Sequence, residues 1–198
     1  MSNDSALVLR LLDVIEHHIA PMTAREVKRG NKIFGAAILL KKDLSLVIAE
    51  TNNEVENPLW HGEMHAIKKL YERDRSTLPD PNDCIFLATH EPCSLCLSAI
   101  TWGGYDNFYY LFSHEDSRDS FAIPHDLKIL KEVFTLDQGG YNKNNAYWQS
   151  HDITKMIAAL NGKNRENLSA RVNDLTALYA DLSAAYQAEK GEAGIPLD

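Results

Sequence analysis

Four residues that can bind a metal or move a proton lie in two short segments of the chain. The stretch "WHGEMHAI" contains His61 and Glu63, and the stretch "PCSLC" contains Cys93 and Cys96. Each segment stands where the apolar spacing predicts the start of a helix. Unpaired backbone N–H groups and the helix dipole stabilise thiolates at such a start, and the thiolate is the form of cysteine that binds zinc. We therefore predict one zinc ion held by His61, Cys93 and Cys96.

Glu63 is the candidate catalytic residue beside this metal. Three protein ligands leave one position of a tetrahedral zinc site open to water, and an open position is typical of catalytic sites. Zinc lowers the pKa of water from about 15.7 to about 7. Glu63 follows His61 by two positions, so we expect its carboxylate beside this water, where it could shuttle protons without binding the metal.

His65 offers an alternative interpretation. It lies one helical turn after His61, so His61, His65, Cys93 and Cys96 could form a closed Cys2His2 site, which is a structural interaction module without activity. A zinc protease of the H-E-x-x-H type is not indicated, because its glutamate directly follows the first histidine. Cys84 has no partner at metal-ligand spacing, and we expect it to be buried in a strand.

The order of the predicted elements indicates an α/β fold with a mixed sheet and helices on both faces. A first helix should end before Pro21. The remaining elements are two hairpin strands, a helix, a strand, a helix and a strand, predicted at residues 33–40, 44–49, 61–71, 84–89, 92–102 and 108–112.

Length and charge limit the functions that are open to the chain. The 198 residues, 44% of them hydrophobic, are typical of a single domain with appendages. A net charge of -8 does not favour nucleic acid as a partner. The start lacks the pattern of a signal peptide, and the longest apolar run, residues 33–40, is too short to span a membrane. We therefore expect a cytoplasmic protein that has no membrane partner.

The two motifs together resemble the signature of the zinc-dependent cytidine deaminase-like superfamily. That signature is H-x-E followed, one strand later, by P-C-x-x-C, and the chain has His61-Gly62-Glu63 and then Pro92 to Cys96. Gly62 stands where alanine is usual. The resemblance covers about residues 33–121. It implies a three-layer fold, a zinc ion as cofactor, and hydrolytic deamination with Glu63 as the proton shuttle.

Within the superfamily the chain is more similar to bacterial guanine deaminases, through "CLSAITWGGYDNFYY" and "RDSF". This resemblance implies a role in purine metabolism, in which a free purine base such as guanine, or a related aminated heterocycle, loses ammonia. It implies substrate contacts by Phe34, Asn52, Trp102 and Asp119, although an aromatic residue such as Trp102 more often packs in a core or at its rim. A nucleoside, nucleotide or tRNA adenosine deaminase is the alternative activity.

The last third of the chain departs from the minimal deaminase domain, which we place at residues 1–160. The resemblance to guanine deaminases implies that Tyr141, Tyr147 and Trp148 could cover an active site. Residues 161–198 should form a helical extension with an apolar stripe. The stripe consists of Leu168, Val172, Leu175, Tyr179, Leu182 and Tyr186. A helix buries such a stripe against its own domain or against another chain, and we expect self-association into a homodimer.

Overall fold

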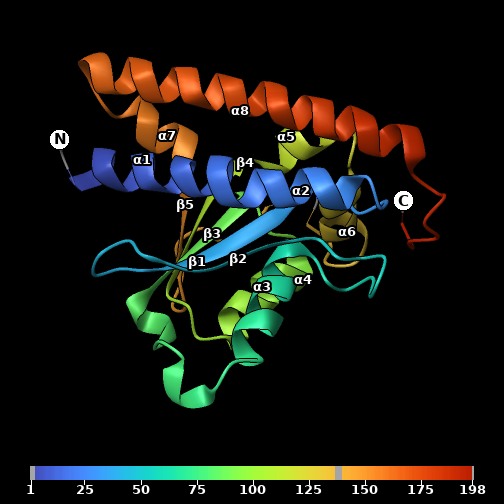
Figure 1. Ribbon diagram of the computed structural model, residues 1–198, viewed down its shortest axis with the longest axis horizontal. Helices are drawn as coiled ribbons and strands as arrows, with labels where there is room; N and C mark the ends of the chain where they lie inside the picture. The colour runs from blue at the N-terminus through green and yellow to red at the C-terminus, as the bar shows by residue number, and fades with distance from the viewer. Residues whose placement is uncertain (1–2, 137–139, 198) are drawn as a thin grey trace.

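A five-stranded mixed sheet lies at the centre of the computed structural model, which describes residues 3–136 and 140–197 (Figure 1). Its strands are β1 (Gly35–Leu40), β2 (Leu46–Thr51), β3 (Cys84–His90), β4 (Asn107–Phe112) and β5 (Gln149–Asp152). They lie in the order β2-β1-β3-β4-β5. β1 runs antiparallel to β2 and β3, whereas β3, β4 and β5 are parallel. The predicted α/β class and mixed sheet are confirmed.

Helices cover both faces of the sheet, as expected (Figure 1). One face carries α3 (Gly62–Tyr71) and α4 (Ser94–Trp102), and the other carries α1 (Asn3–Val14), α2 (Ala20–Val27), α7 (Ile153–Ala158) and α8 (Gly162–Glu189). The short helices α5 (His114–Asp119) and α6 (His125–Glu132) follow β4. No helix among the described residues is both long and apolar enough to cross a membrane.

The apolar run of β1 follows from this double cover. Ala36 and Ile38 pack into the core on the α3 side, while Ala37 and Leu39 pack into the core on the α1 side. A strand that is buried on both faces needs apolar residues at consecutive positions instead of alternating ones. Cys84 is buried at the start of β3, as the sequence predicts.

The first helix does not end before Pro21. A π-helical turn at Ile15–Ile19 joins α1 directly to α2, which continues to Val27. Pro21 falls in the first turn of α2, where an N–H group is not required for an intrahelical bond. The proline is therefore accommodated by a local change of helical register.

Four elements after β4 were missed by the sequence analysis, namely α5, α6, β5 and α7. Strand β5 has the polar sequence "QSHD", which shows no apolar alternation. It pairs with β4 through the backbone, with Asn107 opposite Gln149 and Tyr110 opposite Asp152. The segment that we expected to form a loop or lid therefore ends as an edge strand of the sheet.

The long helix α8 lies along α1, α2 and α7 (Figure 1). The five stripe residues that are buried belong to the same core cluster as Val8 and Leu11 of α1, and Val172 packs against it. These five are Leu168, Leu175, Tyr179, Leu182 and Tyr186. The expectation that self-association buries this stripe is wrong, because the chain's own helices cover it.

Candidate active site

The three predicted zinc ligands lie together at the starts of α3 and α4. His61 is the N-cap residue of α3, Cys93 is the N-cap residue of α4, and Cys96 follows in the first turn of α4. The His61 Nδ1 atom lies 3.4 Å from Cys93 Sγ and 3.7 Å from Cys96 Sγ. The three ligand atoms all lie within 4.8 Å of one another. One imidazole nitrogen and two thiol sulfurs are a donor set that suits zinc.

A close approach between two glycines sets the position of α3. A Cβ atom added at Gly62 would lie 2.6 Å from the Cα atom of Gly35 in β1. The backbone N–H of Gly62 donates to Asn52 Oδ1 at 2.6 Å, so Asn52 satisfies one of the free donors at the helix start. The first turn of α3, with His61 and Glu63, is thereby held directly on the sheet.

Hydrogen bonds and burial divide the protons among the ligands. The bond from Cys96 holds the pKa of the Cys93 thiol well below its usual range. Burial and the negative charge on Cys93 raise the pKa of Cys96 well above its usual range. Burial alone would lower the pKa of His61, but the bond to Cys93 and the nearby negative charges raise it to about 9. The cluster therefore favours a thiolate at Cys93 next to a protonated His61 imidazole. The added proton of His61 and the thiol proton of Cys96 must both leave when a metal binds.

Glu63 lies beside the ligand cluster and is almost completely buried. Burial, followed by the charge on Cys93, raises the pKa of the Glu63 carboxyl to about 7. Cys96 Sγ donates to Glu63 Oε2 at 3.3 Å. A buried carboxyl with this pKa can both take up and release a proton near neutral pH, as general acid–base catalysis requires.

His65 points away from the ligands. Its Nδ1 atom lies 2.9 Å from the Thr51 carbonyl oxygen, and its ring stacks on Trp60 with 5.8 Å between centroids. The group of potential metal ligands found among the described residues does not include it. This placement does not support a closed Cys2His2 site.

Glu54 supports His61 from the side opposite the cysteines. Its buried carboxylate accepts hydrogen bonds from Lys32 Nζ at 3.0 Å and from Asn52 Nδ2 at 2.9 Å. Its Oε1 atom lies 3.8 Å from His61 Nε2. A carboxylate near the second ring nitrogen of a metal-binding histidine fixes the orientation of the imidazole ring.

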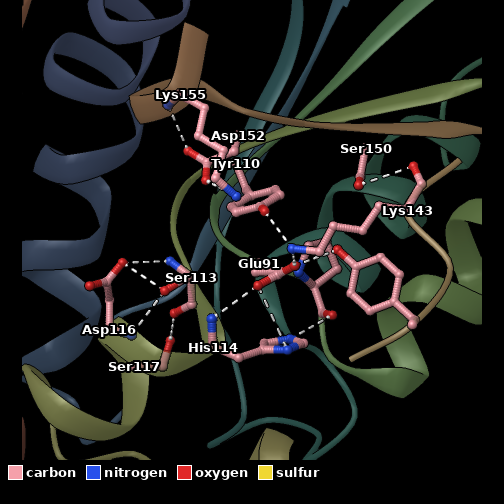
Figure 2. A network of polar contacts seen from close by, with 12 residues as sticks. Glu91, Tyr110, Ser113, His114, Asp116, Ser117, Lys143, Ser150, Asp152 and Lys155 are labelled. Carbon is pink, nitrogen blue, oxygen red and sulfur yellow. Dashed lines mark hydrogen bonds and ion pairs between the residues drawn. The ribbon is translucent and has the colours of Figure 1, made fainter. Parts of the chain in front are cut away.

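Glu91 supports the cysteine-bearing turn, and Figure 2 shows the contacts around it. Its Oε1 atom accepts from Tyr141 OH at 2.6 Å and from Lys143 Nζ at 2.7 Å, while the backbone N–H of His114 donates to Oε2 at 3.1 Å. Burial alone would raise the pKa of Glu91, but the charge on His114 and the bonds from Lys143 and Tyr141 lower it. Glu91 is therefore a carboxylate despite its burial.

A cavity of about 330 Å³ opens onto His61 and Cys93. Its wall is formed by residues from several elements, which are Lys32, Phe34, Glu54, Pro58, Leu59, Ser94, Leu95, Ile123, His125, Asp126, Ile129, Pro196 and Leu197. The Asp126 carboxylate has no hydrogen-bond partner in the part of the chain that the structure describes, and burial raises its pKa to about 6. A larger hollow of about 890 Å³ near Ile85 and Asp106 includes none of the ligands.

The structure brings one of the four expected substrate-binding residues to this cavity, and that residue is Phe34. Asn52 is buried under the start of α3, where both ends of its amide are hydrogen-bonded within the chain. Trp102 is 91% exposed at the end of α4. Asp119 is exposed and pairs with Arg118 at 2.6 Å. Substrate contacts by Asn52, Trp102 and Asp119 therefore have no support from the shape of the site.

The aromatic residues that we expected to form a lid lie elsewhere. Trp148 is buried against Phe108, with 5.0 Å between ring centroids, and its Nε1 atom donates to Thr101 Oγ1. Tyr147 is 70% exposed, and Tyr141 bonds to Glu91. Instead of these residues, Pro196 and Leu197 stand at the cavity wall.

Three features of the site are not predicted by the sequence, namely Glu54, Asp126 and the supporting role of Glu91. Glu54 follows Asn52 by two positions, but a carboxylate in a polar loop gives no pattern that separates it from a solvated one. Asp126 lies seven positions after Asp119, and only the path of the chain between them decides which of the two faces the site. Glu91 directly precedes the P-C-x-x-C motif, but its supporting contacts come from residues far away in the sequence.

Comparison with known proteins agrees with this geometry. A family model described as the cytidine and deoxycytidylate deaminase zinc-binding region matches residues 14–112. The guanine deaminase of Bacillus subtilis (strain 168) is 36% identical over 103 residues, a match that covers 50% of this chain. The match spans 62% of that relative, which is less than two thirds of its length.

Solved structures are similar over more of the chain. The X-ray structure of guanine deaminase from Bacillus subtilis matches with a TM-score of 0.50 and 25% identity, covering 68% of this chain and 86% of that one. The structure of NE0047 in complex with 2,6-diaminopurine matches with a TM-score of 0.51 and 20% identity, covering 91% of this chain and 83% of that one. The second likeness concerns the fold alone.

Proposed function

The chain belongs to the family defined by the cytidine and deoxycytidylate deaminase zinc-binding region, and from this membership we propose that it is a zinc-dependent aminohydrolase of a free purine base. The substrate would be guanine or a related aminated heterocycle, and ammonia would be released. The similarity to the guanine deaminase of Bacillus subtilis supports this choice of substrate class.

The observation that carries the proposal is the position of Glu63. It lies buried beside His61, Cys93 and Cys96, with a pKa raised to about 7. A purely structural zinc site has no use for a buried carboxyl that is not a ligand, and burying one is costly unless it is paired or neutral. A hydrolytic site needs such a group to move protons.

The residues divide the chemistry among them. Zinc, when bound by His61, Cys93 and Cys96, supplies a Lewis acid that lowers the pKa of water. Glu63 takes one proton from the attacking water and passes it to the ring nitrogen next to the amino-bearing carbon. It then takes the remaining proton from the hydroxyl group on that carbon and passes it to the leaving amino group. The C–N bond breaks, the oxygen of water stays on the carbon as a carbonyl, and ammonia leaves.

Asp126 is the residue that we assign to base recognition, in place of Asp119. Its carboxylate faces the cavity without a partner among the described residues, so it can accept hydrogen bonds from adjacent N–H groups of a heterocycle. Phe34 and Ile123 supply apolar surface for the flat ring. The cavity is near the lower end of the roughly 300–1,000 Å³ that ligand sites occupy, which favours a small ligand.

Assembly and location follow as further parts of the proposal. A homodimer is supported by two exposed aromatic residues, Trp102 at 91% and Tyr147 at 70%, because exposed apolar surface is typical of interaction sites. Light scattering would show the dimer, and Trp102→Glu should shift it toward the monomer if α4 contributes to the interface. A cytoplasmic location and a place in purine metabolism accord with a small soluble substrate.

The decisive experiment combines metal analysis with an ammonia-release screen. We expect one zinc ion per chain, and turnover of a free purine base in a panel of purines, pteridines, pyrimidines, triazines and nucleosides. Glu63→Ala should keep its zinc and lose roughly a hundredfold to ten-thousandfold in rate, the usual contribution of a general acid–base group. His65→Ala is the matched control and should also keep its zinc. Loss of zinc in His65→Ala, or full activity in Glu63→Ala, would contradict the proposal.

A further inference from the structure

Two residues of the segment between α6 and β5 bond to the Glu91 carboxylate beside the site. Tyr141 OH and Lys143 Nζ both donate to Glu91 Oε1, at 2.6 and 2.7 Å. Glu91 is only 3% exposed, whereas the side chain of Lys143 is 46% exposed. A half-exposed lysine therefore reaches inward to neutralise a buried charge (Figure 2).

Hydrogen bonds hold both the ammonium group and the main chain of Lys143. Its ammonium group also donates to Tyr110 OH at 2.8 Å, which ties it to β4. Its carbonyl oxygen accepts from the backbone N–H of Ser150 at 2.9 Å, which ties its main chain to β5. Figure 2 shows the side chain extending from the Ser150 side toward Glu91 and Tyr110. The ammonium group thus stands at a defined point between the edge of the sheet and Glu91.

Glu91 begins the turn that carries Cys93. The backbone N–H of Glu91 donates to the Phe112 carbonyl oxygen at 2.7 Å, and His114 Nε2 lies 3.1 Å from the Pro92 carbonyl oxygen. The turn lies between the end of β3 and the start of α4, and Cys93 at its end joins the helix through its carbonyl oxygen, which accepts from the backbone N–H of Leu97 at 2.8 Å. Its geometry depends on these contacts and on the side chain of Glu91.

The other ligand-bearing turn has the same arrangement. Lys32 Nζ donates to Glu54 Oε1 at 3.0 Å, and that oxygen lies 3.8 Å from His61 Nε2. Each of the two segments that supply zinc ligands is thus braced by a buried glutamate that pairs with a lysine. The brace on the His61 side acts on the imidazole itself, while the brace on the cysteine side acts on the backbone that presents Cys93.

We propose that Lys143 and Tyr141 are positioning residues of the metal site, acting through Glu91 on the turn that carries Cys93. The inference rests on the zinc site of the proposed function. The segment at residues 141–150 then holds the Cys93 turn in place and slows the loss of zinc. It has no part in covering the cavity. Removing groups that orient metal ligands from outside typically weakens metal binding by about 10–100-fold.

The test measures zinc release from the loaded full-length protein to an excess of a chromogenic chelator. Lys143→Met should release zinc about tenfold faster or more than the unchanged protein, and Tyr141→Phe should give a smaller increase. Lys143→Arg should restore slow release, because a guanidinium can still donate to Glu91. Lys155→Met is the matched control, since Lys155 pairs with Asp152 on the same side of β5 but is 78% exposed and makes no contact with Glu91.

The melting temperatures of the same variants distinguish a positioning effect on the zinc site from a general loss of stability of the fold. Release from Lys143→Met at the unchanged rate would overturn the proposal, and so would an equal acceleration in Lys155→Met. The zinc-release measurement uses no substrate. If the protein deaminates none of the tested heterocycles, the proposed function is disproved, but zinc release still tests the positioning role of Lys143 and Tyr141.

Discussion

Gly62→Ala is the substitution on which the family resemblance and the structure disagree most clearly. Alanine is usual at this position in the proteins that the motif resembles, so the change looks harmless from the sequence. In this chain an added Cβ atom would meet three backbone atoms of Gly35, at 2.6, 2.8 and 3.0 Å. Gly35 has little free space of its own, because a Cβ atom added to it would lie 2.3 Å from Ile19 Cγ2. The start of α3 must therefore move.

The size of the effect follows from these distances. Ordinary contact begins at 3.4 Å, so the start of the helix must shift by about 0.8 Å. Overpacking of this kind costs about 1–3 kcal/mol, of which the helix preference of alanine over glycine recovers at most about 1 kcal/mol. The net loss therefore lies between about 0 and 3 kcal/mol, and the middle of this range, about 1.5 kcal/mol, corresponds to a melting temperature roughly 3–6 °C lower for a chain of this size. Because the shift carries His61 and Glu63 with it, kcat should fall by about ten- to a hundredfold.

The assay is thermal melting, zinc content and turnover of Gly62→Ala beside Ser94→Ala. Ser94 occupies the equivalent first position of α4, where a Cβ atom is already present. Its substitution should change stability by no more than about 0.5 kcal/mol. If Gly62→Ala melts and turns over like the unchanged protein, the close approach of Gly62 to Gly35 does not position the site.

Three further predictions concern the cavity and the helix that covers the sheet. Asp126→Asn should lower kcat/KM for a guanine-like base by roughly 5- to 150-fold, because unpaired donors cost about 1–3 kcal/mol. Asp119→Asn should leave kcat/KM unchanged, so steady-state kinetics would decide between the two carboxylates. Leu197→Gly should weaken binding of the base, seen as a higher KM with unchanged zinc content, because it removes an apolar part of the cavity wall. A chain truncated before Gly162 should be largely unfolded by circular dichroism, because α8 covers core residues of α1; a cooperative melt near that of the full chain would show that the rest folds alone.

The cluster of potential zinc ligands could be predicted from the sequence, because its residues lie in two short segments. His61 with Glu63, and Cys93 with Cys96, are each fixed by short spacing at a helix start, and helix starts are readable from capping and apolar periodicity. The apolar strands β1, β3 and β4 were readable for a similar reason. Strand β5 was not, because its place at the edge of the sheet depends on backbone pairing and not on an apolar side chain pattern.

The residue that we propose for base recognition could not be predicted from the sequence, because its position depends on the path of a polar segment. Ser113 and Asp116 form a capping box that starts α5, and this short helix places Asp119 at its exposed end beside Arg118. Pro124 then precedes a second short helix, and the first turn of that helix presents Asp126 to the cavity. Both carboxylates lie in segments of similar polarity, so composition does not distinguish them.

The distribution of charge around the site accounts for the kind of substrate that we propose. Four carboxylates lie around the ligands, and they belong to Glu54, Glu63, Glu91 and Asp126. Lys32 pairs with Glu54, and Lys143 pairs with Glu91. Glu63 and Asp126 have no lysine or arginine partner among the described residues. In our proposal Glu63 moves protons and Asp126 accepts hydrogen bonds from the N–H groups of the base. A phosphate group entering this cavity would meet the carboxylates of Glu54 and Asp126, while Lys32 in the cavity wall already pairs with Glu54. The net charge of -8 adds to the repulsion. A nucleoside monophosphate should therefore be turned over far more slowly than its base, and the gap should narrow as salt screens the charges. Equal kcat/KM values for the two at low ionic strength would show that the field does not select the substrate.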